Sequence, residues 1–206
     1  MKNLLFPIMM LSLSLAASGC SQAAFTAVNL PTRFHEMTVV QDVAYSPEPA
    51  CTLDIYVPAS AGHQPLDVIV FFYGGRWTEG EKHNYRFVGA AFTEQNFIVV
   101  VPDYRKYPRV RFPEFVEDGA KALAWVYDHI AEYHGNPERI HVAGHSSGAH
   151  IGALLTADAG YLANEGKDRS RVIRDFAGLA GPYAFTPDEP DLEDMFALRA
   201  TIRTCR

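Results

Sequence analysis

One stretch, residues 139–155, constrains the fold more than any other part of the chain. It reads RIHVAGHSSGAHIGALL, in which a run of strand type enters a turn flanked by glycines and a small-residue helix leaves it. Gly144, Ser146 and Gly148 fit the pattern G-x-S-x-G, whose glycines give room to a serine held in a strained backbone conformation. The stretch predicts a strand, a tight turn and a helix, with Ser146 as a candidate nucleophile. The alternative is a serine that merely opens a helix.

Other apolar runs of strand length alternate with helical patterns along the chain. Strands are predicted at 66–73, 96–102, 139–144 and 172–181, and an antiparallel pair at 37–46 and 51–58. Helices are predicted at 85–95, 112–135 and 147–157 from the spacing of their apolar residues. Strands that alternate with helices predict an α/β fold, with a mostly parallel sheet and helices on both faces.

Composition narrows the classes of function. The chain has 206 residues, of which 48% are hydrophobic, so it is long enough for one domain with a single core. Its formal net charge of −6 gives no basic surface for nucleic acid. The 3 cysteines and 8 scattered histidines show no spacing typical of zinc ligands, so neither a metal nor a cofactor is expected.

The first residues predict an export signal. Lys2 precedes the apolar run LLFPIMMLSLSLAA, which is too short and too rich in serine for a comfortable membrane span. The following LAASGC resembles a bacterial lipobox, which implies cleavage before Cys20 and lipidation of its sulfur. Residues 1–19 are then the signal peptide, 20–35 a polar linker, and the mature chain a lipoprotein on the periplasmic or outer-membrane side. The alternative is an ordinary signal peptide and a soluble periplasmic protein. In an exported chain Cys51 and Cys205 would form a disulfide if their Cα atoms lie within about 7 Å.

A glycine pair after the strand predicted at 66–73 supplies a second candidate element of the site. An acyl-transfer enzyme needs hydrogen-bond donors that point at the developing oxyanion. The backbone N–H groups of Gly74 and Gly75, in the sequence YGGRW, and of Ser147 are the candidates. A plain Gly-Gly turn is the alternative interpretation of the pair.

Several motifs taken together resemble a known family. They are YGGRW, VVVPDYRKYP, RFPEFVEDGAKALAWV, YHGNPERIHVAGHSSGAHIGALL and GLAGPYAF. Over roughly residues 38–186 the chain resembles α/β-hydrolase esterases of the carboxylesterase and hormone-sensitive-lipase-like group, most of all the bacterial acetyl/feruloyl esterase-like branch, with kynurenine formamidase and isoprenylcysteine methylesterase as relatives. The resemblance implies Ser146 as nucleophile, the amides of Gly74, Gly75 and Ser147 as oxyanion hole, and a structural turn at Asp103 and Tyr104.

The chain departs from this family in two places. Tyr73 occupies the position where the group usually has a histidine that positions the oxyanion loop, and its hydroxyl could serve likewise. The fold also places an acidic residue and then a histidine after the nucleophile, but no histidine follows His150. His145 and His150 are poor candidates for the base, and no acidic residue is assigned among Asp175, Asp188, Asp191 and Asp194. Residues 36–206 are therefore expected to form a partial α/β-hydrolase domain, incomplete at the C-terminal side.

The function that the resemblance implies is hydrolysis of small carboxylic esters by a serine hydrolase held at a membrane by its lipid anchor. Its partners would be a small-molecule ester substrate and the membrane, and the oligomeric state stays open. Two alternatives remain. One is a truncated, catalytically inactive hydrolase-fold lipoprotein, and the other is an amidase similar to arylformamidases, which share the nucleophile.

Overall fold

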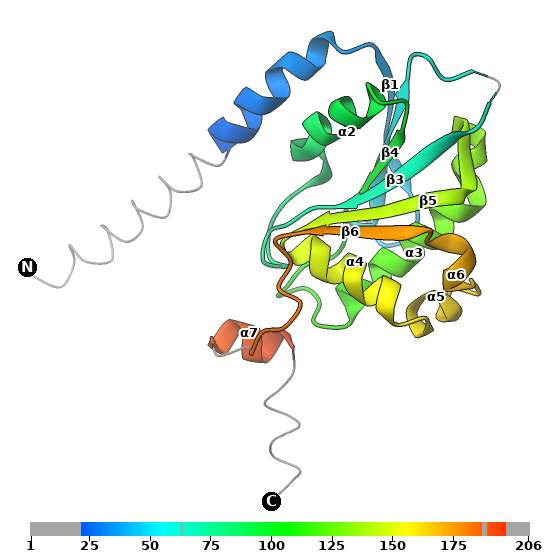
Figure 1. Ribbon diagram of the computed structural model, residues 1–206. Helices are drawn as coiled ribbons and strands as arrows, with labels where there is room; N and C mark the ends of the chain where they lie inside the picture. Colours follow the sequence, from blue (N-terminus) through cyan, green and yellow to red (C-terminus); the bar gives the residue numbers. More distant parts are fainter. Residues whose placement is uncertain (1–21, 63, 187–188, 197–206) are drawn as a thin grey trace, which may run out of the picture.

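A computed structural model describes residues 22–62, 64–186 and 189–196. Its centre is a six-stranded sheet with the order β1-β2-β4-β3-β5-β6 (Figure 1). The strands are β1 (Met37–Ala44), β2 (Thr52–Pro58), β3 (Leu66–Phe72), β4 (Ile98–Pro102), β5 (Gly135–His145) and β6 (Asp175–Leu179). β1 pairs with β2 and β2 with β4 antiparallel, whereas β3, β4, β5 and β6 run parallel. The predicted antiparallel pair and mostly parallel sheet are thus confirmed.

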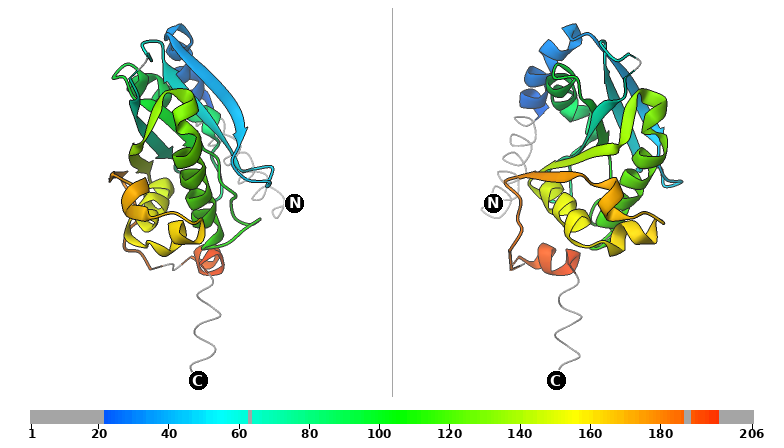
Figure 2. Two further views of the ribbon diagram at one scale, coloured as in Figure 1. Left: turned by 90° about the vertical axis from the view of Figure 1, so that its right-hand side faces the viewer. Right: turned by 45° about the vertical axis from the view of Figure 1, so that its right-hand side comes forward.

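Helices cover both faces of the sheet (Figure 2). On one face lie η2 (Lys82–Tyr85) and α2 (Arg86–Thr93), which packs on β2 and β4. On the other lie α3 (Glu114–His129), η3 (Ile130–Tyr133), α4 (Ser147–Ala157), α5 (Gly160–Asn164) and α6 (Arg169–Val172). The short helix α7 (Pro190–Met195) follows the segment that leaves β6. This is the α/β arrangement that the alternating sequence patterns predict.

The core lies at the centre of the sheet because its middle strands are apolar along most of their length. Val68, Val70 and Phe72 of β3 have no exposed surface, and neither have the residues of β4 from Ile98 to Val101. Strands of a parallel sheet that is covered on both faces have this composition. The buried strands direct their carboxyl ends, and the loops that follow, to one edge of the sheet.

Two predicted elements differ from the structure. The strand predicted at 172–181 begins at Asp175, because Arg169–Val172 form α6, whose N-terminus is capped by the Asp168 carboxylate accepting a hydrogen bond from the N–H of Ser170. The polar linker expected at 20–35 is helical where it is described, over 22–29 and in η1 (Leu30–Phe34). Three alanines among residues 22–29 favour a helix there.

The cysteine predictions fall mostly outside the described residues. Cys51 lies in the core with no exposed surface, whereas Cys20 and Cys205 belong to the parts of the chain that are not described. Lipidation of Cys20 and pairing of Cys51 with Cys205 therefore stay predictions. Within the described ranges, no helix has the length and apolar character needed to cross a bilayer, and no group of His, Cys, Asp and Glu side chains is arranged to hold a metal ion.

Candidate active site

Ser146 occupies a strained turn between β5 and α4. Its backbone angles are φ 53° and ψ −122°, in a region that side-chain-bearing residues rarely adopt. A Cβ on Gly148 would lie 2.1 Å from the carbonyl oxygen of Phe72, and one on Gly144 would lie 2.6 Å from the carbonyl oxygen of Gly148. The strand, turn and helix predicted from the sequence are present, and glycine is required on both sides of the serine for the physical reason given above.

The loop after β3 brings Gly74 against this turn. A Cβ on Gly74 would lie 3.0 Å from the Cβ of Ser146. Gly75 has φ 148°, and its carbonyl oxygen accepts hydrogen bonds from the N–H groups of Thr78 and Glu79. Among the described residues no atom accepts a hydrogen bond from the N–H of Gly74 or Gly75. Both amides are therefore available to a ligand beside Ser146, and Ser147 adds the first N–H of α4.

Tyr73 holds this loop through stacking and hydrogen bonding. Its ring stacks between those of Tyr85 and Tyr104, with centroids 5.1 and 5.0 Å away. Its hydroxyl donates to the carboxylate of Asp103, which also accepts a hydrogen bond from the N–H of Lys82. The Tyr104 hydroxyl donates to the carbonyl oxygen of Tyr73 at 2.9 Å. Burial, with the nearby Asp103 carboxylate, raises the pKa of the Tyr73 hydroxyl well above its usual value, so the hydroxyl remains a donor.

Two cavities meet at Ser146. The first, of about 270 Å³, lies between the glycine loop and the N-terminal helical segment, and the second, of about 290 Å³, lies between α4 and the segment after β6. Ser146 and Arg76 line both. The first is also lined by Gln22, Phe25, Gly74, Gly75, Glu79, Gly80, Asn84, Tyr85 and His145, and the second by Trp77, Ser147, Ala180, Gly181, Pro182, Phe185 and Leu192. Such an arrangement suits a substrate with one group on each side of a reacting carbonyl.

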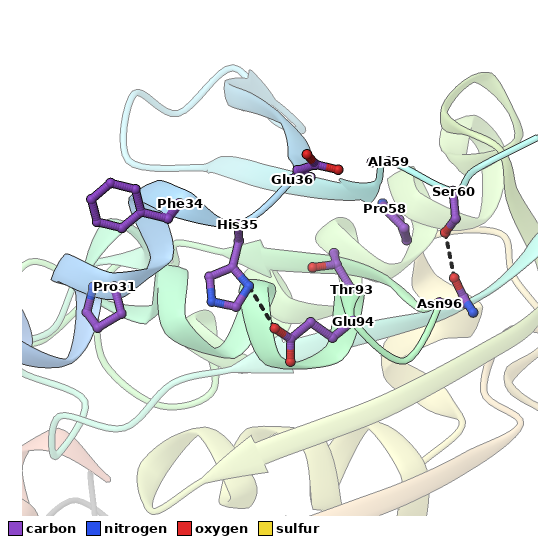
Figure 3. A pocket seen from close by; sticks show the side chains of 10 residues that line it. All are labelled: Pro31, Phe34, His35, Glu36, Pro58, Ala59, Ser60, Thr93, Glu94 and Asn96. Atoms are coloured by element: carbon purple, nitrogen blue, oxygen red, sulfur yellow. Dashed lines mark hydrogen bonds and ion pairs between the residues drawn. The ribbon is translucent and has the colours of Figure 1, made fainter.

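A larger cavity, of about 560 Å³, lies elsewhere (Figure 3). It is lined by residues that include His35, Glu94 and Asn96, and so lies at the amino end of β4, opposite the loops that carry Ser146. His35 and Glu94 form an ion pair there, with Nδ1 and Oε1 2.9 Å apart. This larger cavity therefore does not include the strained serine.

Several residues of the site were missed by the sequence analysis. Arg76 and Trp77 both have positive φ, 50° and 60°. The Arg76 guanidinium pairs with Glu189 at 2.6 Å, and the Trp77 ring contacts Phe185 and Phe196 with centroids 5.7 and 5.1 Å away. These contacts join residues that are more than 100 positions apart in the sequence, so no local sequence pattern predicts them. The only local signal was the aromatic residue two positions after the glycine pair.

None of the candidate bases is bonded to Ser146. Within the described residues no imidazole or carboxylate makes a hydrogen bond with its Oγ. Asp175 pairs with His141 at 2.8 Å at the start of β6, whereas the strand end near Ser146 is Leu179, whose carbonyl oxygen accepts the Ser146 N–H. His150 packs edge-on against Trp77 with centroids 5.2 Å apart, and its Nδ1 has no partner among the described residues. That the chain has no assignable triad acid or base stays a prediction.

The burial of His150 predicts a pH-dependent stability. Desolvation lowers its pKa to about 4, from near 6.5 in an unfolded chain. The unfolded state therefore binds more protons between these values, so the free energy of unfolding falls as the pH is lowered from about 7 to 4. Allowing for partial solvent access, the loss is on the order of 2 kcal/mol. Urea unfolding at pH 7.5 and 4.5 measures it, and a His150→Gln variant that shows an equally large fall would contradict this origin.

Comparison with known proteins places the chain in a family of esterases. The BD-FAE family profile matches residues 53–176. The chain is 34% identical over 155 residues to the probable isoprenylcysteine alpha-carbonyl methylesterase ICMEL1 of Arabidopsis thaliana, and 33% identical over 147 residues to esterase LipC of Mycobacterium tuberculosis. The matches cover 73% and 68% of this chain. Its structure is similar to that of esterase B from Lactobacillus rhamnosis, with a TM-score of 0.67 and 22% identity over 92% of this chain and 63% of that one.

The relatives are longer proteins. The match spans 32% of the length of the Arabidopsis protein and 36% of that of LipC. The matched part includes the sheet from β2 onward, the glycine loop and the turn at Ser146. The chain belongs to the BD-FAE family and has the α/β-hydrolase fold of carboxylesterases.

Proposed function

We propose that this chain is a serine hydrolase of small carboxylic esters, with Ser146 as its nucleophile. The observation that carries the proposal is the position of Ser146. It lies on a strained turn, within van der Waals reach of the glycine loop, at the meeting point of two cavities. A substrate bound in either cavity would therefore reach the Ser146 hydroxyl. The esterase names of the relatives support ester substrates.

In the proposed reaction, Ser146 Oγ attacks the carbonyl carbon of the ester, and its proton passes to solvent water, which returns a proton to the departing alcohol. The carbonyl oxygen becomes an oxyanion, which the N–H groups of Gly74, Gly75 and Ser147 would stabilise. Collapse of this intermediate expels the alcohol with a proton and leaves an acyl group on Oγ. Water then attacks the acyl group and releases the carboxylic acid. The proposal assigns no general base, because no described residue is bonded to Oγ.

The absence of a bonded base among the described residues favours a second candidate function. A serine hydroxyl without a base is a weak nucleophile at neutral pH. The chain would then be a hydrolase-fold protein without turnover. The two candidate functions differ in whether the Ser146 hydroxyl reacts with a substrate, so an experiment can distinguish them.

We further propose, from the sequence alone, that the chain is exported and lipidated at Cys20. The apolar run and LAASGC carry this proposal. Incorporation of labelled fatty acid into the full chain, lost in a Cys20→Ser variant, would support it. A processed chain without label would favour a soluble periplasmic protein.

Hydrolysis of p-nitrophenyl acetate by the full chain tests the esterase proposal. We expect turnover by the wild type and a fall to the rate without protein in a Ser146→Ala variant. Ser60→Ala is the matched control, because the Ser60 hydroxyl bonds Asn96 far from the site and its loss leaves the reaction unchanged. Equal rates for the wild type and Ser146→Ala would overturn the proposal. Faster turnover of a formyl-amide substrate would instead assign an amidase.

A further inference from the structure

The helical segment 22–34 carries an exposed apolar surface. No charged residue occurs from Gln22 to Thr32. Phe34, Leu30 and Val28 are 87%, 53% and 44% exposed, and Figure 3 shows the Phe34 ring pointing away from the neighbouring side chains. We name this surface the N-terminal apolar face; it consists of Ala23, Ala24, Ala27, Val28, Leu30 and Phe34, all of them exposed. Exposed large apolar side chains grouped on one segment usually mark a contact with a partner or a lipid surface.

Hydrogen bonds fix the orientation of this segment on the protein. The Asn29 amide donates to the carbonyl oxygen of Asn84 at 2.8 Å and accepts from the N–H of Phe87 at 2.9 Å. The Arg86 Nε donates to the Thr32 hydroxyl at 3.0 Å. The segment therefore runs along the outer side of α2 (Figures 1 and 2). Its apolar face is exposed to solvent.

The same segment forms a wall of the candidate active site. Gln22 and Phe25 line the cavity of about 270 Å³ together with Gly74 and Ser146. The Phe25 ring contacts that of Tyr85, with centroids 5.4 Å apart. The beginning of the segment therefore lies at the cavity beside Ser146, whereas Phe34, near its end, lines the cavity at the amino end of β4.

The lipid anchor proposed above would begin next to this wall. Gln22 follows Cys20 by two residues, and two residues of extended chain span at most about 7 Å. Acyl chains on the Cys20 sulfur would thus enter the bilayer within that distance of the cavity lining. This continuity identifies a lipid surface, rather than a second protein, as the occupant of the apolar face.

The charges beside the apolar face agree with a lipid surface. Arg33 and Arg86 line a hollow of about 410 Å³ with Asn29 and Leu30. Neither arginine forms an ion pair within the described ranges, although the chain as a whole has a net charge of −6. Basic side chains near a bilayer surface are attracted by anionic headgroups.

We infer that the N-terminal apolar face lies on the bilayer and turns the cavity beside Ser146 toward it, so that the substrate is a lipophilic ester taken from the membrane. The substrate class rests on the proposed function, because it takes the reaction at Ser146 as given. The orientation does not depend on that reaction, because it follows from the helical segment and from the lipidation of Cys20 proposed above. The ester group would occupy the cavity, and its acyl chain would pass Phe25 toward the lipid.

Energy transfer from tryptophan to a dansyl headgroup lipid tests the orientation. The chain has 2 tryptophans. Trp77 lines the second cavity at Ser146, and Trp125 lies in the later turns of α3, which lead back to the amino ends of the parallel strands. For the lipidated full chain on vesicles, we expect more transfer in a Trp125→Phe variant, which keeps Trp77, than in a Trp77→Phe variant. If Trp77→Phe does not fold, the Trp125→Phe variant alone gives the transfer from Trp77, and the difference between wild type and Trp125→Phe gives the transfer from Trp125. Equal transfer, or more from Trp125, would overturn the inference.

Turnover of a long-chain ester carried in anionic vesicles tests the substrate class. A Leu30→Glu/Phe34→Glu double variant of the lipidated chain removes two exposed apolar contacts and adds two negative charges. We expect it to hydrolyse the vesicle-borne ester about tenfold more slowly, while its rate on soluble p-nitrophenyl acetate stays within about twofold of the wild type. Ala163→Glu, on exposed α5, adds a negative charge elsewhere and is the control.

The outcomes separate the inference from the proposed function. Unchanged turnover of the vesicle-borne ester in the double variant would overturn the substrate class. A wild-type chain that dimerises without lipid, and becomes monomeric in the double variant, would show that the apolar face binds a second copy instead. If the wild type hydrolyses neither ester, the proposed function fails, and the energy transfer still decides the orientation.

Discussion

A Gly148→Ala variant is expected to lose about 3 kcal/mol or more of its free energy of unfolding. The added Cβ would lie 2.1 Å from the carbonyl oxygen of Phe72 and 2.4 Å from that of Tyr73. Both are backbone atoms at the end of β3, in the middle of the sheet, so no side-chain rotation relieves the overlap. Either α4 must move off the sheet or β3 must shift, and each change opens the core beneath Ser146.

Urea unfolding monitored by circular dichroism measures the effect. Gly62→Ala is the matched control, because the nearest atom to its added Cβ is 3.8 Å away and its φ is not positive. That variant should unfold at the wild-type urea concentration or slightly above it. A Gly148→Ala protein as stable as Gly62→Ala would show that α4 does not approach β3 as closely as described.

An Asp118→Ala variant is expected to be destabilised by about 3 to 5 kcal/mol. The Asp118 carboxylate on α3 has no exposed surface, and it accepts two hydrogen bonds from the Arg105 guanidinium, at 2.7 and 2.8 Å, and one from the Arg105 N–H at 3.1 Å. Together they tie α3 to the segment after β4. Removing the carboxylate leaves a mostly buried guanidinium without its partner, and the cost of that unpaired charge is the main part of the loss.

The matching double variant separates this cost from the loss of packing. In Arg105→Met/Asp118→Leu both charges are replaced by apolar side chains of similar size, so most of the stability should return. Thermal unfolding of the single and double variants gives the comparison. A double variant as unstable as Asp118→Ala would contradict the explanation by an unpaired charge, and would point to the lost contacts themselves.

The sheet was predictable because its signals are local. The continuous apolar runs of β3 and β4 indicated burial on both faces, and the glycines around Ser146 indicated a close approach of backbones, which is the contact of Gly148 with Phe72. Boundaries were less accurate where polar caps decide them, as at Asp168, whose side chain starts a short helix that ends at the first residue of the strand predicted at 172–181.

The surroundings of the candidate site were not predictable from local patterns. Phe25 reaches the cavity because residues 22–34 pack on α2, about 60 positions away in sequence, through Asn29 and Phe87. The prediction of a polar linker is wrong for these residues, although the sequence from Gln22 to Thr32 has no charged residue. Arg76 and Trp77 acquire positive φ from a loop whose partners, Glu189 and Phe196, follow β6.

The central claim is that Ser146 is a reactive nucleophile, and covalent labelling tests it most directly. The folded full chain is treated with a fluorophosphonate, digested, and the modified peptide identified by mass spectrometry. In this reaction Oγ attacks phosphorus and fluoride leaves, so only an activated hydroxyl is labelled. The account predicts one adduct on Ser146 and none in Ser146→Ala. A chain that is folded by circular dichroism but carries no adduct, or carries it on another serine, would contradict the account.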